Sequence, residues 1–400
     1  MKKNILITSE SVTEGHPDKL CDQISDKILD EFIAKDRQAR VAVETMASDQ
    51  IIFIAGEISS TAKVDIAAAA RSVIREIGYI DQAYGLDAEK CLILSNINVQ
   101  STDIAAGVNK AMEYKQQMGD WQDQIKNLGA GDQGMMYGFA CRETSDYMPL
   151  PIYLAHRLAE RLAKVRKDGR LPYLRPDGKT QVTIEYDANG WPIALDSIII
   201  AAQHDATVSY PKLCEDIINQ VINPLLPANL HTSDMKLYVN STGKFLLGGP
   251  RADTGLTGRK IMVDTYGGLC RHGGGAFSGK DPSKVDRSGA YMARYVAKNI
   301  VAAGIADRCE ISLAYAIGVA QPVAINVHTY GTEKIVNEQI VNLVLDQFDF
   351  RPGAIIENFD LLRPIYKETA VYGHFGRNDK KFPWERIDKV SGLRKAVFGD

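Results

Sequence analysis

The sequence lacks the patterns that mark membrane, disulfide-stabilised or zinc-binding proteins. No apolar run is long enough to span a bilayer, and the start MKKNILITSESV has too short an apolar core for a signal peptide. The six cysteines are scattered and form no C-x-x-C pair. We therefore expect buried free thiols in a protein of the reducing cytoplasm, with no membrane partner.

The chain also lacks an excess of positive charge. Its 47 basic and 50 acidic residues give a net charge of −3, which argues against a dedicated nucleic-acid binder. No fixed short period is visible, so a solenoid is not expected. With 400 residues, of which 45% are hydrophobic, the chain predicts a soluble globular protein of two or three domains.

One segment, 255–287, combines glycines, cations and acids in a way that indicates a phosphate site. Its cationic residues are Arg259, Lys260, Arg271, Lys280, Lys284 and Arg287. Glycines let backbone N–H groups approach an anion, the cations neutralise it, and the interleaved acids can hold a divalent metal. This predicts a bound polyphosphate with Mg²⁺. The alternative is a solvated charged loop, but Gly273-Gly274-Gly275 has a high ordering cost.

A standard P-loop does not account for this segment. Gly274–Lys280 almost fits the Walker A spacing, but Asp281 stands where a Ser or Thr should hold Mg²⁺. A strand leading directly into the glycines is also missing. The segment therefore shares with a P-loop only the general ability of glycines and a lysine to bind an anion.

Two further glycine-containing motifs carry chemistry. Gly15-His16-Pro17-Asp18-Lys19 sets an imidazole and a carboxylate at the start of an expected helix, where anions bind. The sequence GAGDQG, 129–134, presents one acid that could hold a ligand ammonium. Each also has a simpler interpretation, a helix-start acid in the first motif and a tight connection in the second. The other six histidines show no metal spacing and are interpreted as structural.

Apolar periodicity predicts an α+β fold. Helices are expected over 18–35, 63–78, 151–167, 214–222 and 289–303. Strands are expected over 41–46, 51–57, 91–94, 180–186, 191–202 and 260–264, with two more in 311–331. We divide the chain into an N-terminal domain 1–103, a loop and insertion 104–128, a central domain 129–247 and a C-terminal domain 248–400.

Together, SESVTEGHPDK, GAGDQG, LRPDGKTQV, GPRADTGLTGRKIMVDTYGG and GGGAFSGKDPSKVDRS closely resemble the S-adenosylmethionine synthetase family (methionine adenosyltransferases). The likeness covers nearly the whole chain. It implies three similar α/β domains in a pseudo-threefold arrangement, paired into dimers and usually tetramers with active sites between subunits. It also implies attack of methionine sulfur on C5′ of ATP, after which the released tripolyphosphate is hydrolysed to phosphate and pyrophosphate.

The resemblance also implies roles for individual residues. His16 would sit at the breaking C5′–O bond, and two Mg²⁺ ions are expected, with Asp18 and Asp286 as ligands. The phosphates would face Lys179, Arg259, Lys260 and Lys280. The remaining ATP contacts would be Asp177, Gly178, Lys244, Phe245, Asp253 and Ala276. Methionine would be held by Glu57, Gln100, Asp132, Asp253 and Lys284. Glu44 and Ser278 would bind K⁺.

Two features depart from the family pattern. Lys244 stands where arginine is common, which keeps the charge but loses the bidentate fork. The segment 104–128 is longer than usual. Two other functions were weighed, a kinase or NTPase using the glycine-rich lysine turn and a non-catalytic nucleotide sensor. The products formed from ATP and methionine would separate all three.

Overall fold

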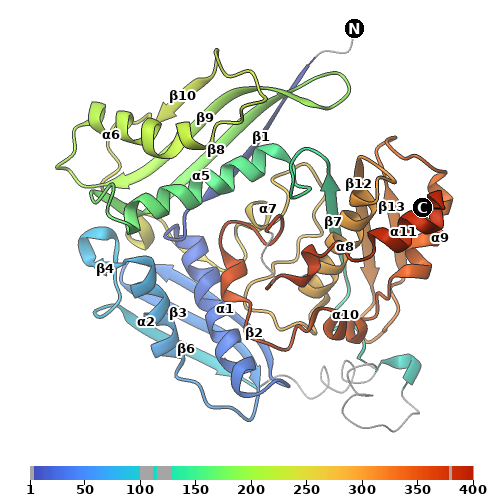
Figure 1. Cartoon of the computed structure of the whole chain (residues 1–400). Helices are drawn as coiled ribbons and strands as arrows, with labels where there is room; N and C mark the ends of the chain where they lie inside the picture. The colour runs from blue at the N-terminus through green and yellow to red at the C-terminus, as the bar shows by residue number, and fades with distance from the viewer. Residues whose placement is uncertain (1–3, 100–110, 115–127, 378–380, 400) are drawn as a thin grey trace.

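The computed structural model describes residues 4–99, 111–114, 128–377 and 381–399. Three lobes lie around a common centre (Figure 1), and each consists of a sheet with helices packed against it. This mixture confirms the α+β class. Among the described residues, no helix is both long and apolar enough to cross a membrane.

The first lobe is a four-stranded sheet with helices packed against one of its faces. Its strands, in spatial order, are β11 (Gly255–Leu256), β2 (Arg40–Ser48), β3 (Ile51–Ser59) and β6 (Leu92–Asn98). Its helices are α1 (Pro17–Lys35) and α2 (Ile66–Ile77). Inward residues such as Val43, Ile52 and Ile54 are buried at 1% exposure or less. Gly78 ends α2 in the left-handed conformation (φ 103°), as expected of a C-terminal glycine.

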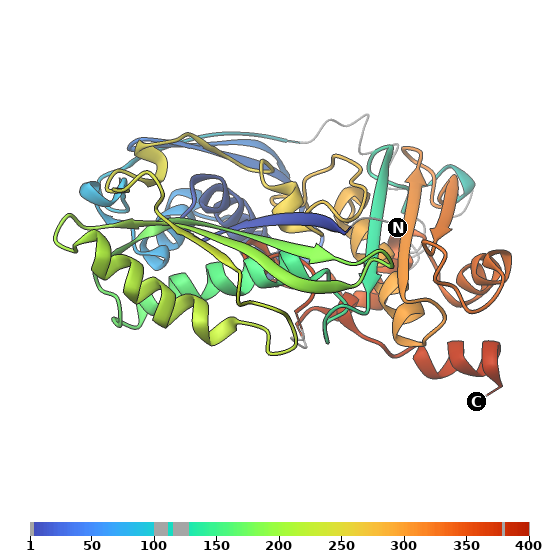
Figure 2. The same ribbon diagram turned by 90° about the horizontal axis from the view of Figure 1, so that it is seen from above.

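The second lobe forms a separate hydrophobic core. Its strands are β1 (Ile5–Val12), β8 (Leu174–Tyr186), β9 (Pro192–His204) and β10 (Lys236–Val239). Its helices are α5 (Leu150–Lys167) and α6 (Tyr210–Ile217), which lie along the same side of β8 and β9 (Figure 2). The expected antiparallel return from β8 to β9 is confirmed, with Asp187 closing the turn through a 2.9 Å bond from its N–H to the carbonyl of Trp191.

The third lobe contains a three-stranded sheet and most of the C-terminal helices. Its strands are β13 (Ala324–His328), β12 (Arg308–Tyr315) and β7 (Gly134–Cys141). Its helices are α7 (Ile261–Asp264), α8 (Val285–Ala302), α9 (Asn337–Gln347), α10 (Pro352–Phe359) and α11 (Val390–Phe398). The short pair β4 (Ile80–Asp81) and β5 (Leu86–Asp87) stands apart.

The lobes exchange strands that are distant in sequence. Strand β1 pairs with β8, β7 pairs with β12, and β11 pairs with β2. Each sheet therefore draws a strand from another part of the chain. The domain boundaries 1–103, 129–247 and 248–400 remain a prediction, and 104–128 lies mostly outside the described residues.

Two sequence expectations were wrong in detail. The segment 260–264 is not a strand but contains the short helix α7, closed by a 2.9 Å bond from the N–H of Asp264 to the carbonyl of Lys260. The helix expected over 214–222 begins earlier, at Tyr210, and continues from Ile218 to Ile222 as a π-turn. The three apolar residues of 260–264 cannot distinguish a strand from a helical turn by their period alone.

Candidate active site

The N-terminus of α1 presents a buried, neutral imidazole. His16 is the N-cap of α1 and is 1% exposed, and its Nδ1 accepts a 3.2 Å hydrogen bond from the N–H of Asp18. The pKa of His16 is lowered to about 3, mainly by burial and also by the positive charges of Lys260 and Lys179, while Asp18 opposes this shift. Because Nδ1 accepts, the proton of the neutral ring sits on Nε2. His16 can therefore donate a hydrogen bond from Nε2 at neutral pH.

Asp18 binds the segment that carries two of the predicted phosphate contacts. Its Oδ2 lies 2.6 Å from Nζ of Lys260, and its Oδ1 accepts the N–H of Leu256 at 2.9 Å. Nε of Arg259 is 3.8 Å from Oδ1. Burial acts to raise the pKa of Asp18, but the hydrogen bonds from Lys260 and Leu256 lower it below its usual value. The structure thus brings His16, Asp18, Arg259 and Lys260 together.

The predicted nucleotide contacts of β8 lie beside this cluster. Asp177 accepts the N–H of Gly249 at 2.9 Å through Oδ2, while its buried Oδ1 has no protein partner. Burial raises the pKa of Asp177 to about 6, against the lowering effects of that hydrogen bond and of Lys179. A side chain at Gly178 would press on Leu162 and on the carbonyl of Ala201, which explains the glycine. Lys179 itself is exposed.

Three other predicted contacts lie on the segment that leads from β10 toward β11. Lys244 and Asp253 are exposed, and Phe245 is half-buried. The carbonyl of Phe245 accepts the N–H of His204 at the end of β9, and the N–H of Asp253 donates to the carbonyl of Gly249. These bonds tie the segment to the second lobe, near Asp177.

A cavity of about 500 Å³ gathers three of the five predicted methionine contacts, Glu57, Asp132 and Lys284. Its lining includes Glu57, Asp132, Lys280, Lys284 and Asp286. Two of these form an ion pair, with Nζ of Lys280 2.7 Å from Oδ2 of Asp286. The cavity therefore contains acids that suit an ammonium and lysines that suit an anion. Of the other two predicted methionine contacts, Asp253 is absent from the lining of this cavity, and Gln100 lies outside the described residues.

Sequence reasoning missed Arg40 and Asn98, which line this cavity. It noted Asp281 without a role, and Asp281 pairs with the lining residues Arg40 and Lys284. Asp281 is fully buried, and its Oδ2 accepts from Lys284 at 2.8 Å and from the N–H of Val41 at 2.8 Å. Burial opposes ionisation, but Lys284 and Arg40 hold the pKa of Asp281 at about 2. The departure from Walker A spacing at Asp281 was the available signal.

The two predicted potassium ligands lie on neighbouring segments. Ala42 of β2 bridges antiparallel to Lys280, and the N–H of Val43 donates to the carbonyl of Gly279 at 3.1 Å. Ser278 and Gly279 belong to a turn, so the register of this bridge does not continue to them. The hydroxyl of Ser278 is buried and has no protein partner, and Glu44 is exposed. Binding of one cation by both residues stays a prediction.

The two groups of site residues adjoin through a glycine contact. A side chain on Gly258, which has a φ of 81°, would strike Cβ of Ala276 at 2.6 Å. Ala276 is thus held against the segment that carries Arg259 and Lys260. Within the described ranges no three His, Cys, Asp or Glu residues form a metal cluster. Mg²⁺ needs only one or two carboxylates when phosphates complete its shell, so Asp18 and Asp286 fit such an ion.

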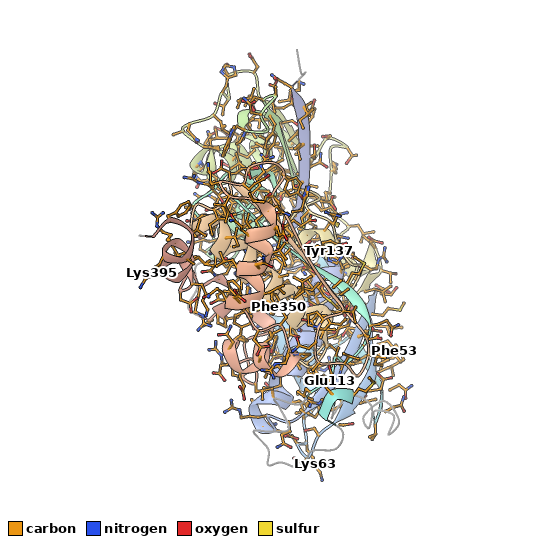
Figure 3. The ribbon with its side chains drawn as sticks, turned by 90° about the vertical axis from the view of Figure 1, so that its right-hand side faces the viewer. Phe53, Lys63, Glu113, Tyr137, Phe350 and Lys395 are labelled. Atoms are coloured by element: carbon orange, nitrogen blue, oxygen red, sulfur yellow. The ribbon has the colours of Figure 1, made fainter. Side chains whose placement is uncertain are left out.

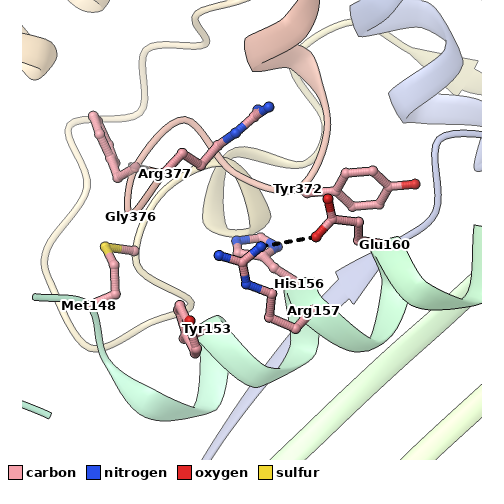
Figure 4. A pocket seen from close by; sticks show the side chains of 9 residues that line it. Met148, Tyr153, His156, Arg157, Glu160, Tyr372, Gly376 and Arg377 are labelled. Carbon is pink, nitrogen blue, oxygen red and sulfur yellow. Dashed lines mark hydrogen bonds and ion pairs between the residues drawn. The ribbon is translucent and has the colours of Figure 1, made fainter. Parts of the chain in front are cut away.

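A second cavity lies away from this site, between α5 and the segment around Tyr372–Arg377 (Figure 4). His156 lines it and is 6% exposed. Its Nδ1 lies 2.8 Å from the hydroxyl of Ser11, and its Nε2 has no protein partner. Arg157 pairs with Glu160 at 3.1 Å along the same helix. His156 was interpreted from the sequence as structural, and its burial agrees with that.

Comparison with known proteins identifies the family of the chain. The chain matches the family models of the three S-adenosylmethionine synthetase domains in order. The N-terminal domain matches residues 4–102, the central domain 127–245 and the C-terminal domain 247–386. The S-adenosylmethionine synthase of Desulforudis audaxviator (strain MP104C) is 57% identical over 394 residues, which cover 98% of this chain and 99% of that protein. The chain therefore belongs to the S-adenosylmethionine synthetase family of enzymes.

Proposed function

We propose that the protein forms S-adenosylmethionine from ATP and L-methionine by attack of the methionine sulfur on C5′ of ATP. The S–C5′ bond forms as the C5′–O bond breaks, and tripolyphosphate leaves and is then hydrolysed to phosphate and pyrophosphate. The observation that carries the proposal is the neutral His16 at the α1 N-terminus, beside Asp18, Lys260 and Arg259. A helix N-terminus with these cations suits a polyphosphate.

The chemistry requires positioning and charge stabilisation more than a base. A thioether sulfur is a neutral nucleophile with no proton to remove, so orientation of the two substrates lowers the barrier. Negative charge grows on the leaving oxygen, where a fixed hydrogen-bond donor stabilises the transition state. Nε2–H of His16 is such a donor. Lys179, Lys260 and Lys280 would neutralise the rest of the chain of phosphates.

Metal ions would be held by the acids already described. Asp18 and Asp286 would hold Mg²⁺, which supplies positive charge to the phosphate oxygens when bound. Both carboxylates now pair with lysines, Lys260 and Lys280, and those lysines would be released toward the phosphates. Glu44 and Ser278 would hold K⁺ at the edge of the cavity.

The outer face of the first sheet supports a site shared by two chains. Leu256, Met46, Phe53 and Leu94 form one row across its four strands, because they are partners in the registers of β11, β2, β3 and β6. All four are between 37% and 46% exposed. Figure 3 places Phe53 at the outer edge of the molecule. An exposed apolar row of this kind marks a protein interface.

This face also carries site residues. Glu44 lies on the same face of β2 as Met46, and Glu57 lies on the same face of β3 as Phe53. Side chains alternate between the two faces of a strand, and the members of these pairs are two and four positions apart. A second copy of the chain docked on the apolar row would cover the cavity that contains Glu57. We infer a dimer through this sheet, on which a tetramer can be built.

Product analysis tests the proposal. The purified protein is incubated with ATP, methionine and Mg²⁺, with and without K⁺, and the products are identified by mass spectrometry. S-adenosylmethionine with phosphate and pyrophosphate supports the proposal. ADP or AMP would indicate the kinase or NTPase instead, and binding without turnover would indicate a nucleotide sensor.

A further inference from the structure

Helix α1 carries four aspartates at intervals of four residues, which places them along one side of the helix. They are Asp18, Asp22, Asp26 and Asp30. The first three are between 0% and 2% exposed, and Asp30 is half-buried. Buried carboxylates are rare unless they are paired, so each of these needs a partner.

Each aspartate accepts backbone N–H groups from a segment far away in the sequence. Asp18 accepts from Leu256 at 2.9 Å, and Asp22 accepts from Gly258 at 2.8 Å. Asp26 accepts from Gly279 at 2.8 Å. Asp30 accepts from Tyr366 and Lys367, both at 2.9 Å. The helix thus holds three separate loops by their main chain.

Two of these loops carry the cations of the proposed phosphate site. Gly258 directly precedes Arg259 and Lys260, and Gly279 directly precedes Lys280. Both glycines have a φ near 80°, a conformation that other residues rarely adopt. The aspartates that hold them are one helical turn apart, or about 6 Å along the axis.

We propose that Asp22 and Asp26 are positioning residues, which hold the 258–260 and 279–280 segments on one helix and so set the spacing between Arg259, Lys260 and Lys280. This inference rests on the proposed function, since the spacing matters only if these cations act on one polyphosphate. Asp30 makes the same kind of bond from the same helix, but to residues 366 and 367, which carry none of the proposed site residues.

The two positioning residues differ in what else depends on them. Asp26 makes a bidentate pair with the buried Arg287, at 2.7 and 2.8 Å, so its loss would leave a buried charge unpaired. Asp22 pairs with Lys19 at 2.8 Å, but Lys19 also binds Asp264. Lys19 therefore keeps a partner when Asp22 is replaced, which makes Asp22 the better residue to test.

The experiment compares Asp22→Ala with the matched control Asp30→Ala. For each variant kcat and KM for S-adenosylmethionine formation, affinity for inorganic tripolyphosphate with Mg²⁺, and thermal stability are measured. A shift of the cations by about 1 Å should lower kcat by about 100-fold. We expect Asp22→Ala to show this loss and weaker tripolyphosphate binding, with KM for methionine unchanged. Asp30→Ala should lower stability and leave kcat within about twofold of the parent.

Two further variants sharpen the test. Asp22→Asn keeps an acceptor for the N–H of Gly258 and should recover most of the lost kcat. If Asp22→Ala does not fold, Asp22→Ser gives the same comparison, because its shorter hydroxyl cannot reach Gly258. Equal loss of kcat in Asp30→Ala, or a folded Asp22→Ala with parental kcat and tripolyphosphate affinity, would overturn the inference. Absence of S-adenosylmethionine formation by the parent protein would instead overturn the proposed function, and the tripolyphosphate affinities would still test the positioning.

Discussion

The N–H of Asp18 donates to Nδ1 of His16, so one imidazole both caps α1 and presents Nε2–H to the site. Asparagine is among the best N-cap residues, so His16→Asn keeps the cap and replaces the Nε2–H of the imidazole by a shorter amide. We expect its rate of S-adenosylmethionine formation to fall by about 100- to 1000-fold, as for removal of an oxyanion donor. Its thermal stability should stay close to that of the parent. Steady-state kinetics and thermal denaturation provide the two measurements.

The same variant separates the two chemical steps. Hydrolysis of added tripolyphosphate does not break the C5′–O bond, so His16→Asn should retain it. The variant His16→Ala, which loses the cap as well, should add a loss of about 1 kcal/mol in stability. Equal loss of both activities in His16→Asn would contradict the assigned role.

Lys280 and Asp286 form an ion pair at the rim of the cavity, and their side chains are 25% and 24% exposed. Because Asp286 keeps access to water, Lys280→Ala should fold normally. It should raise the activation barrier for tripolyphosphate hydrolysis by about 3 kcal/mol, as loss of a charge-stabilising group does. Lys63, a lysine outside the site, provides the control through Lys63→Ala. An unchanged rate of tripolyphosphate hydrolysis in Lys280→Ala would remove this lysine from the site.

Much of the local structure follows from the sequence because its signals are short-range. The helix from Pro17 to Lys35 has apolar spacing, a proline at its first position and an acid in its first turn. The hairpin of β2 and β3 and the ends of α2 and α8 were likewise expected. The cations Arg259, Lys260 and Lys280 could be predicted to face phosphates because glycines and lysines cluster within one segment.

The long-range arrangement could not be obtained in this way. Strand β1 pairs with residues 179–186, and no local pattern reveals a partner that far away. Sequence patterns did not reveal Asp22, Asp26 and Asp30 of α1 for a related reason, because apolar periodicity ignores polar residues whose partners come from other segments. Arg40 was missed because a single arginine in a strand carries no motif.

Met46 and Phe53 are partners across β2 and β3, and the proposed dimer through this face of the first sheet can be tested there. Phe53→Glu would introduce a charge at the centre of the apolar row and should convert the proposed dimer to a monomer with strongly reduced activity. Ile80, which is 63% exposed on β4, is the matched control, and Ile80→Glu should leave the assembly intact. Sedimentation analysis measures both. A Phe53→Glu protein that stays dimeric would place the interface elsewhere.

Potassium dependence tests the proposal that Glu44 and Ser278 bind K⁺. Glu44→Gln keeps the size of the side chain and removes the charge that attracts the cation. The parent should be activated by K⁺, and the variant should need at least about tenfold more K⁺ for the same activation. Glu185, which is remote from the site on β8, supplies the control Glu185→Gln. Equal K⁺ dependence in parent and Glu44→Gln would exclude Glu44 as a ligand.

Acid stability should depend on His156. Its pKa is lowered from 6.5 to about 3, mainly by burial and also by the positive charges of Lys19, Arg377 and Arg157. Below pH 6.5 the unfolded chain therefore binds a proton that the folded chain does not, and the free energy of unfolding falls by about 1.4 kcal/mol for each pH unit until about pH 3. His156→Gln has no imidazole to take up this proton on unfolding, so its stability should fall less steeply between pH 6.5 and pH 5 than that of the parent. Urea denaturation at several pH values measures the two slopes, and parallel curves would show that His156 is protonated in the folded protein.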